Sequence, residues 1–102
     1  QKRMRQRIAQ WHLPRQTTES LRTFSTHYNA ILAGWWQYYG SFYPTEVWKV
    51  FRHFDLTLAW WARRKYKTLR GHKRRSRRWL AKVSRRESEL FVHWRLWYGM
   101  AR

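Results

Sequence analysis

Apolar side chains recur at alternating steps of three and four residues between positions 21 and 38, and no other feature constrains the fold as strongly. Steps of this size place side chains on one face of an α-helix, whereas a strand alternates every two residues. The side chains are Leu21, Phe24, Tyr28, Ile31, Trp35 and Tyr38. We therefore predict a helix here, capped by Thr17 or Thr18 at its start and by Gly40 at its end.

A second helix of the same kind begins at Pro44, which suits a first helical turn because its missing N–H would have no partner there. Glu46 complements the helix dipole near this start. The apolar face comprises Val47, Phe51, Phe54, Leu58 and Trp61. The spacing predicts a helix that continues to about Lys67, before Gly71 breaks it.

Three shorter segments complete the predicted secondary structure. Residues 2–12 form a basic helix that Leu13-Pro14 ends, because a residue before proline disfavours the α conformation. A short basic helix spans about 76–85. Residues 90–98 are aromatic without a clear period, so they form an irregular tail or a short strand that packs on the bundle.

The chain length suits one domain, and we predict a single all-α domain over residues 1–102. It comprises a small bundle of three main helices, a short basic C-terminal helix and an irregular aromatic tail. Because the chain begins with Gln1 rather than methionine, we expect it to be a fragment of a longer protein.

Positive charge dominates the chain, with 23 Lys and Arg against 5 Asp and Glu and a formal net charge of +18. The cations concentrate from Arg63 to Arg86, a stretch without any acid. A solvated helix face normally mixes both signs and gains from i,i+4 pairs. Unpaired cations at this density instead indicate a polyanionic partner, since binding phosphates releases counterions. RNA or DNA fits best, and an anionic membrane surface is the alternative.

The predicted RNA-binding side chains all lie in this basic stretch. They are Arg63, Arg64, Lys65, Lys67, Arg70, His72, Lys73, Arg74, Arg75, Arg77, Arg78 and Lys82. Arginine outnumbers lysine among them, and its planar guanidinium both binds phosphate through paired hydrogen bonds and stacks on exposed bases.

The aromatic residues divide into two groups by their position on the predicted helices. Five fit core positions and form the scaffold that presents the cations: Trp35, Tyr38, Phe51, Phe54 and Trp61. Four lie off the apolar faces, and each either packs in the core or is free to stack on a base or contact a neighbouring domain: Trp36, Tyr39, Trp60 and Tyr66. We expect Gly34 to permit close helix–helix approach.

Catalysis by this chain is not expected. The few acids offer no pair for a two-metal site, and we expect Asp55 to pair with Arg52 or with a cation on a neighbouring helix. The histidines are scattered and cysteine is absent, so the sequence predicts no metal site, no disulfide and no cofactor. No apolar run of membrane-spanning length is present, and we expect neither a membrane nor a small-molecule partner.

Several motifs in order resemble one family. They are Asn29, Gly34-Trp35-Trp36-Gln37-Tyr38-Tyr39, Phe54-Asp55, Trp61-Ala62-Arg63-Arg64 and Trp79-Leu80-Ala81-Lys82. The residue after Asn29 is Ala30, where the family often has proline. Together they resemble the thumb and maturase-specific region (domain X) of group II intron-encoded reverse transcriptases. The resemblance covers roughly residues 2–95.

The resemblance implies a domain that binds structured intron RNA to assist splicing and intron mobility, and that positions a template–primer duplex for the reverse transcriptase. Its partners would be intron RNA, an RNA/DNA duplex and the rest of the polypeptide. The parent would be an RNA-directed DNA polymerase whose Tyr-x-Asp-Asp active site this chain lacks, inside a bacterial cytoplasm or an organelle. The alternatives are a structural docking thumb of a related reverse transcriptase, such as a CRISPR-associated one, and a basic DNA-binding module.

Overall fold

The computed structural model describes residues 2–100 and places them in helices joined by short connections. The elements are α1 (Lys2–Gln10), the 3₁₀ helix η1 (Leu13–Arg15), α2 (Leu21–Tyr39), α3 (Pro44–Lys65), the 3₁₀ helix η2 (Lys67–Leu69), α4 (Lys73–Arg86) and α5 (Val92–Met100). The described residues contain no strand, so the predicted all-α fold is confirmed. None of their helices is long and apolar enough to cross a membrane.

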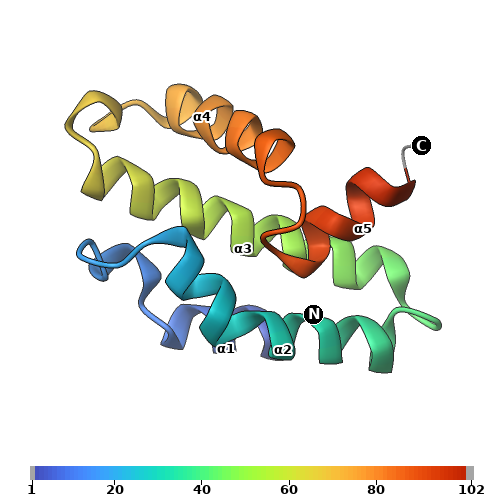
Figure 1. The fold of residues 1–102 in the computed structure, drawn as a ribbon. Helices are drawn as coiled ribbons and strands as arrows, with labels where there is room; N and C mark the ends of the chain where they lie inside the picture. Colours follow the sequence, from blue (N-terminus) through green and yellow to red (C-terminus); the bar gives the residue numbers. More distant parts are fainter. Residues whose placement is uncertain (1, 101–102) are drawn as a thin grey trace.

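Helix α3 forms the middle of the molecule (Figure 1). Helix α4 lies along one side of it, and α1 and α2 lie along the other. Helix α2 and α3 run antiparallel and are joined by the short turn at residues 40–43. Helix α5 packs against α2. Elements from both halves of the sequence therefore cover α3.

The apolar face of α3 forms the centre of the core as predicted. Its members Val47, Phe51, Phe54, Leu58 and Trp61 are all buried. Trp61 also donates a hydrogen bond from its indole Nε1 to the carbonyl of Gln16 at 2.8 Å, which ties the segment after η1 to α3. Burying each large apolar side chain contributes about 1.5–3 kcal/mol relative to leaving it exposed.

Helix α2 has Gly40 as its C-cap, as predicted, but it differs from the prediction at its start and in the orientation of its last turns. Ser20, rather than Thr17 or Thr18, caps its start, because the Ser20 hydroxyl accepts a hydrogen bond from the Thr23 amide. The assignment of Tyr38 to the core is wrong, since its side chain is 80% exposed. In the last turns the half-buried Trp36 packs against the core instead, and its ring lies 5.7 Å from that of Trp48.

Helix boundaries elsewhere differ by a few residues. Helix α1 ends at Gln10 because the backbone turns at His12, which has a left-handed φ of 52°. Helix α3 ends at Lys65, and the basic helix α4 already begins at Lys73. The predicted irregular tail is also wrong, because Val92–Met100 forms the helix α5.

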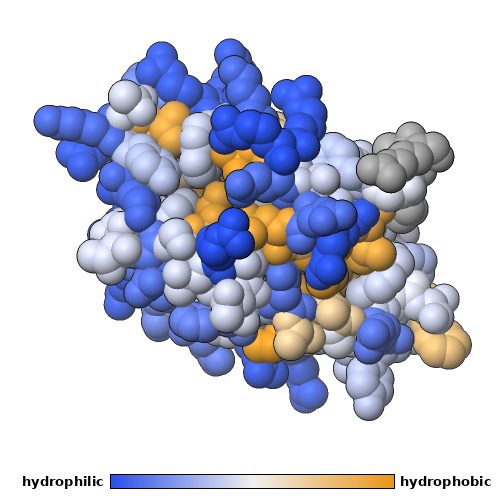
Figure 2. All heavy atoms as spheres, in the orientation of Figure 1, coloured by the Kyte–Doolittle hydropathy of each residue, from blue (hydrophilic) through white to orange (hydrophobic). Residues whose placement is uncertain are grey.

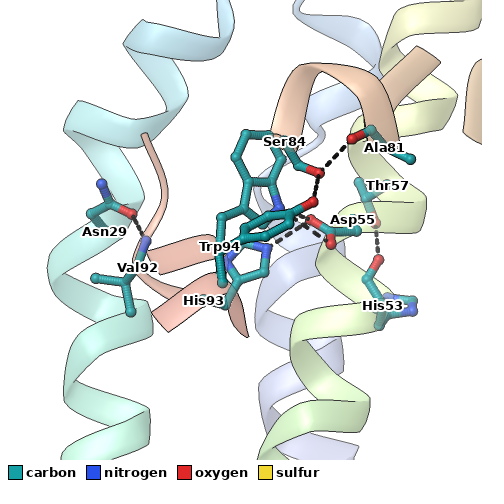
Figure 3. Close-up of polar contacts among 10 residues, drawn as sticks. Asn29, His53, Asp55, Thr57, Ala81, Ser84, Val92, His93 and Trp94 are labelled. Atoms are coloured by element: carbon teal, nitrogen blue, oxygen red, sulfur yellow. Dashed lines mark hydrogen bonds and ion pairs between the residues drawn. The ribbon is translucent and has the colours of Figure 1, made fainter. Parts of the chain in front are cut away.

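Two polar side chains from earlier in the chain hold α5 in place (Figure 3). The Asn29 amide donates to the Leu90 carbonyl at 2.9 Å and accepts from the Val92 amide at 3.0 Å. Asp55 lies 2.7 Å from His93 Nε2 and accepts from the Trp94 indole at 3.1 Å. Asp55 therefore joins α3 to α5 through His93 and Trp94, rather than pairing with Arg52 or with a lysine or arginine of a neighbouring helix as predicted.

The two glycines of the Gly34–Gly40 segment have different environments, and the expected role of Gly34 is wrong. A Cβ on Gly34 would meet no atom within 4 Å, so no neighbour requires glycine there. A Cβ on Gly40 would strike the Trp36 carbonyl and lie 2.9 Å from two ring carbons of Trp36. The close contact that requires a glycine therefore lies between Gly40 and Trp36, at the C-terminal end of α2.

Substitution of the two glycines tests this assignment. We expect Gly40→Ala to lower the free energy of unfolding by about 1–3 kcal/mol, because the Trp36 ring and the turn must shift. We expect Gly34→Ala to raise it by about 0.5–1 kcal/mol, because alanine favours a helix interior. Urea denaturation of both variants measures the difference, and equal losses of stability would contradict it.

Candidate nucleic-acid interface

Helix α4 separates its small and apolar side chains from its cations. Ser76, Leu80, Val83 and Ser84 are buried, and their spacing keeps them on the face toward α3. Arg74, Arg78 and Lys82 follow one another at four-residue steps on the opposite face and are exposed. Figure 2 shows hydrophilic side chains crowded along the α4 edge, above an apolar band that crosses the middle of this view. Helix α4 thus presents a cationic ridge to solvent.

The start of α4 carries positive charge where a helix prefers negative charge. Its first turn contains Lys73, Arg74 and Arg75 and no acid, and His72 provides no side-chain cap. The exposed amide ends of a helix N-terminus carry partial positive charge, so these cations are repelled by the helix as well as by one another. An anion placed here would relieve both repulsions.

Two of the predicted RNA-binding residues also hold the fold together. Arg63 donates from Nη1 to the hydroxyl of buried Ser76 at 3.0 Å, which ties α3 to α4. Lys65 donates to the carbonyl of Glu19, and its ammonium lies 5.2 Å from the centre of the Trp61 ring. Both side chains are half-buried. The other predicted RNA-binding residues are exposed: Arg64, Lys67, Arg70, His72, Lys73, Arg74, Arg75, Arg77, Arg78 and Lys82.

A groove between α1, η1, α3 and α4 extends this cationic surface. It has a volume of about 560 Å³, and the cations that line it are Arg15, Arg63, Arg64, Lys73 and Arg77. Acids are absent from the described residues that line it. Arg15 was not among the predicted RNA-binding residues, because only the folded chain brings η1 beside the end of α3.

One histidine in this groove stays neutral near pH 7. Burial, and secondly the positive charge of Arg5, lower the pKa of His53 below its ordinary value. A lower pKa favours the uncharged imidazole, so His53 adds no cation to the groove at neutral pH.

Within residues 2–100, no group of three His, Cys, Asp or Glu side chains lies close enough together to hold a metal ion. The chemistry that the described surface does offer is the binding of anions by guanidinium and ammonium groups.

Comparison with known families identifies a family for most of the chain. The family model described as "Group II intron, maturase-specific domain" matches residues 1–79. The match extends from α1 into the middle of α4 and includes every predicted RNA-binding residue except Lys82. No curated protein and no solved structure gives a significant match to the chain.

The repulsion at the start of α4 predicts an unusual effect of charge reversal. We expect Arg74→Glu to raise the free energy of unfolding by about 0.3–1 kcal/mol at low ionic strength, because a carboxylate favours a helix N-terminus. Arg74→Gln, which only removes the cation, should give a smaller gain. Urea denaturation at low and high salt measures both effects, which should shrink as salt screens the charges. A loss of stability in Arg74→Glu would contradict the interpretation.

Proposed function

Because the chain belongs to the family of group II intron maturase-specific domains, we propose that it binds folded intron RNA through the cationic ridge of α4 and the adjoining α3–α4 connection. The family places the chain in group II intron splicing, which confirms the resemblance to a maturase-specific region. The observation that carries the proposal is the ridge of Arg74, Arg78 and Lys82, which is exposed and is not paired with acids in any described contact.

The form of this surface favours contacts with phosphates over contacts with base edges. The ridge runs along a helix whose other face is buried, so successive cations face outward at intervals of about 6 Å. The duplex parts of RNA present rows of phosphates, and their deep, narrow major groove excludes side chains. The ridge therefore suits recognition of RNA by charge and shape.

We propose the same surface as the contact with template and primer in the parent protein. A duplex of RNA with DNA offers phosphate rows of the same charge, so one cationic ridge serves both ligands. On this proposal the chain is the binding part of an intracellular RNA-directed DNA polymerase, and the chemistry belongs to another part of that protein.

Affinity for intron RNA across a salt series tests the main proposal. We expect the affinity of the 102-residue chain to fall steeply as salt rises, because each phosphate contact releases counterions. The triple variant Arg74→Gln, Arg78→Gln, Lys82→Gln should bind more weakly. The slope of log affinity against log salt should become shallower by about one for each cation removed.

A matched control separates the ridge from net charge. The triple variant Arg22→Gln, Lys49→Gln, Arg95→Gln removes three exposed cations from α2, α3 and α5 and leaves α4 intact. It should keep the steep slope. Equal losses in the two triple variants would show binding by overall charge alone, and a flat salt response of the unmodified chain would overturn the proposal.

A second candidate function is docking to another protein segment, and exposed aromatic residues at the α2–α3 turn favour it. We call them the aromatic tip: Tyr38, Tyr39, Phe42 and Tyr43. Tyr38 and Phe42 are 80% and 79% exposed, which is unusual for side chains of this size when they gather at one place. The tip lies at the start of α3, about 33 Å along that helix from its cationic end. The two surfaces can therefore serve different partners.

Sedimentation of the isolated chain tests the docking role. We expect it to self-associate as concentration rises, because the aromatic tip would lack its partner. Tyr38→Ser with Phe42→Ser should abolish the association and leave RNA affinity unchanged. Association that persists in this double variant would exclude the tip as the cause.

A further inference from the structure

Trp60 stands among the cations of the α3–α4 region. It is 53% exposed, although α3 buries its neighbour Trp61 completely. Arg63 and Arg64 follow it at steps of three and four residues, so all three side chains lie on one face of α3. A large indole one turn before two guanidinium groups is therefore presented on the same face as they are.

Two hollows meet at Trp60. The groove between α1, η1, α3 and α4, of about 560 Å³, is lined by Trp60, Arg63 and Arg64. A second hollow of about 420 Å³ is lined by the same three residues together with Arg70 and Gly71. Trp60 thus belongs to the walls of both, and none of the described lining residues is acidic.

The larger hollow combines an apolar part with cations. Ile8, Ala9, Pro14 and Leu56 line it beside the indole, and Arg15 and Lys73 line it as well. A hydrogen bond from Arg63 to Ser76 holds that guanidinium in position while leaving its other N–H groups available. An apolar and aromatic part suits a nucleobase, and the cations suit its phosphate.

The base in question cannot belong to a continuous helix. Paired bases of an RNA duplex are stacked on one another, and their faces are closed to a protein side chain. Unpaired bases in loops and bulges turn outward and stack on aromatic side chains. The exposed face of Trp60 therefore selects for an unpaired nucleotide beside the duplex that the α4 ridge contacts.

We propose that Trp60 binds one unpaired RNA nucleotide, with the base stacked on the indole and the phosphate held by Arg64 and the remaining N–H groups of Arg63. This inference rests on the proposed binding of RNA by the cationic surface and adds a structural feature that the RNA must have. It gives the chain a means of recognising bulged or looped RNA in addition to its charge.

Three hairpins test the inference: one fully paired, one with a single bulged purine and one with an abasic residue at the bulge. We expect the 102-residue chain to bind the bulged purine hairpin about 5- to 150-fold more tightly than either of the others, the range for one base stacked on an aromatic side chain. Trp60→Leu should remove this preference and leave affinity for the paired hairpin unchanged. Trp60→Phe should retain much of it.

Trp97→Leu is the matched control, because Trp97 is 59% exposed but lies on α5, outside both hollows. It should preserve the preference for the bulge. Circular dichroism of each variant verifies that it is folded, which we expect because both side chains are largely exposed.

The outcomes separate this inference from the proposed function. If all three hairpins bind in a salt-dependent way but with equal affinity, the proposed role of Trp60 is overturned and the proposed function stands. Equal weakening of all three by Trp60→Leu would do the same and assign Trp60 to the duplex contact. Unchanged RNA affinities with altered self-association would assign it to a protein contact and overturn the inference. Failure of every hairpin to bind would overturn both proposals.

Discussion

Mutual repulsion among the cations is the constraint that the whole structure must overcome. A formal net charge of +18 on 102 residues opposes any compact state. The repulsion is strongest from Arg63 to Arg86, which form the end of α3, η2 and α4. The opposing force is burial of apolar side chains around α3. Phe51, Phe54 and Trp61 lie at its centre, and other helices cover it on both sides. The aromatic core is thus the condition for presenting so many cations together.

The same repulsion explains why some cations serve the fold. Arg63 and Lys65 lie at the end of α3, where core and surface meet. Each donates to a neutral oxygen, the hydroxyl of Ser76 or the carbonyl of Glu19, rather than to a carboxylate. A neutral acceptor leaves the full positive charge of the surface in place, whereas an ion pair would cancel part of it. The end of α3 is thus stabilised, and its attraction for anions is retained.

The sequence predicted the parts of the fold that depend on local spacing. The faces of α2 and α3 repeat at steps of three and four, so their helices were predictable, as was the start of α3 at Pro44. Helix α5 was not, because apolar residues occur nearly all around it and its position depends on Asn29 and Asp55 from distant elements. The packing of the half-buried Trp36 against the core, in place of Tyr38, likewise depends on Trp48, which only the fold brings near.

The candidate site was likewise predictable from the sequence only in part. A run of cations is visible in the sequence, although its role in RNA binding stays a prediction. Arg15 joins the groove only because η1 packs against α3, whereas the position of Trp60 off the apolar face of α3 was already predicted from its spacing. Local charge density is thus readable from sequence, whereas the composition of a groove depends on packing.

The contacts of Asn29 and Asp55 with α5 bear on where this domain ends. The family match stops at residue 79, within α4, yet Leu80, Val83, Phe91 and Trp94 beyond it are all buried. A boundary drawn by similarity would cut through one continuous hydrophobic core. A protein shortened to residue 79 would uncover the side of α3 that α4 protects and leave both polar side chains without their partners in α5. The unit of sequence similarity is therefore smaller than the unit of folding.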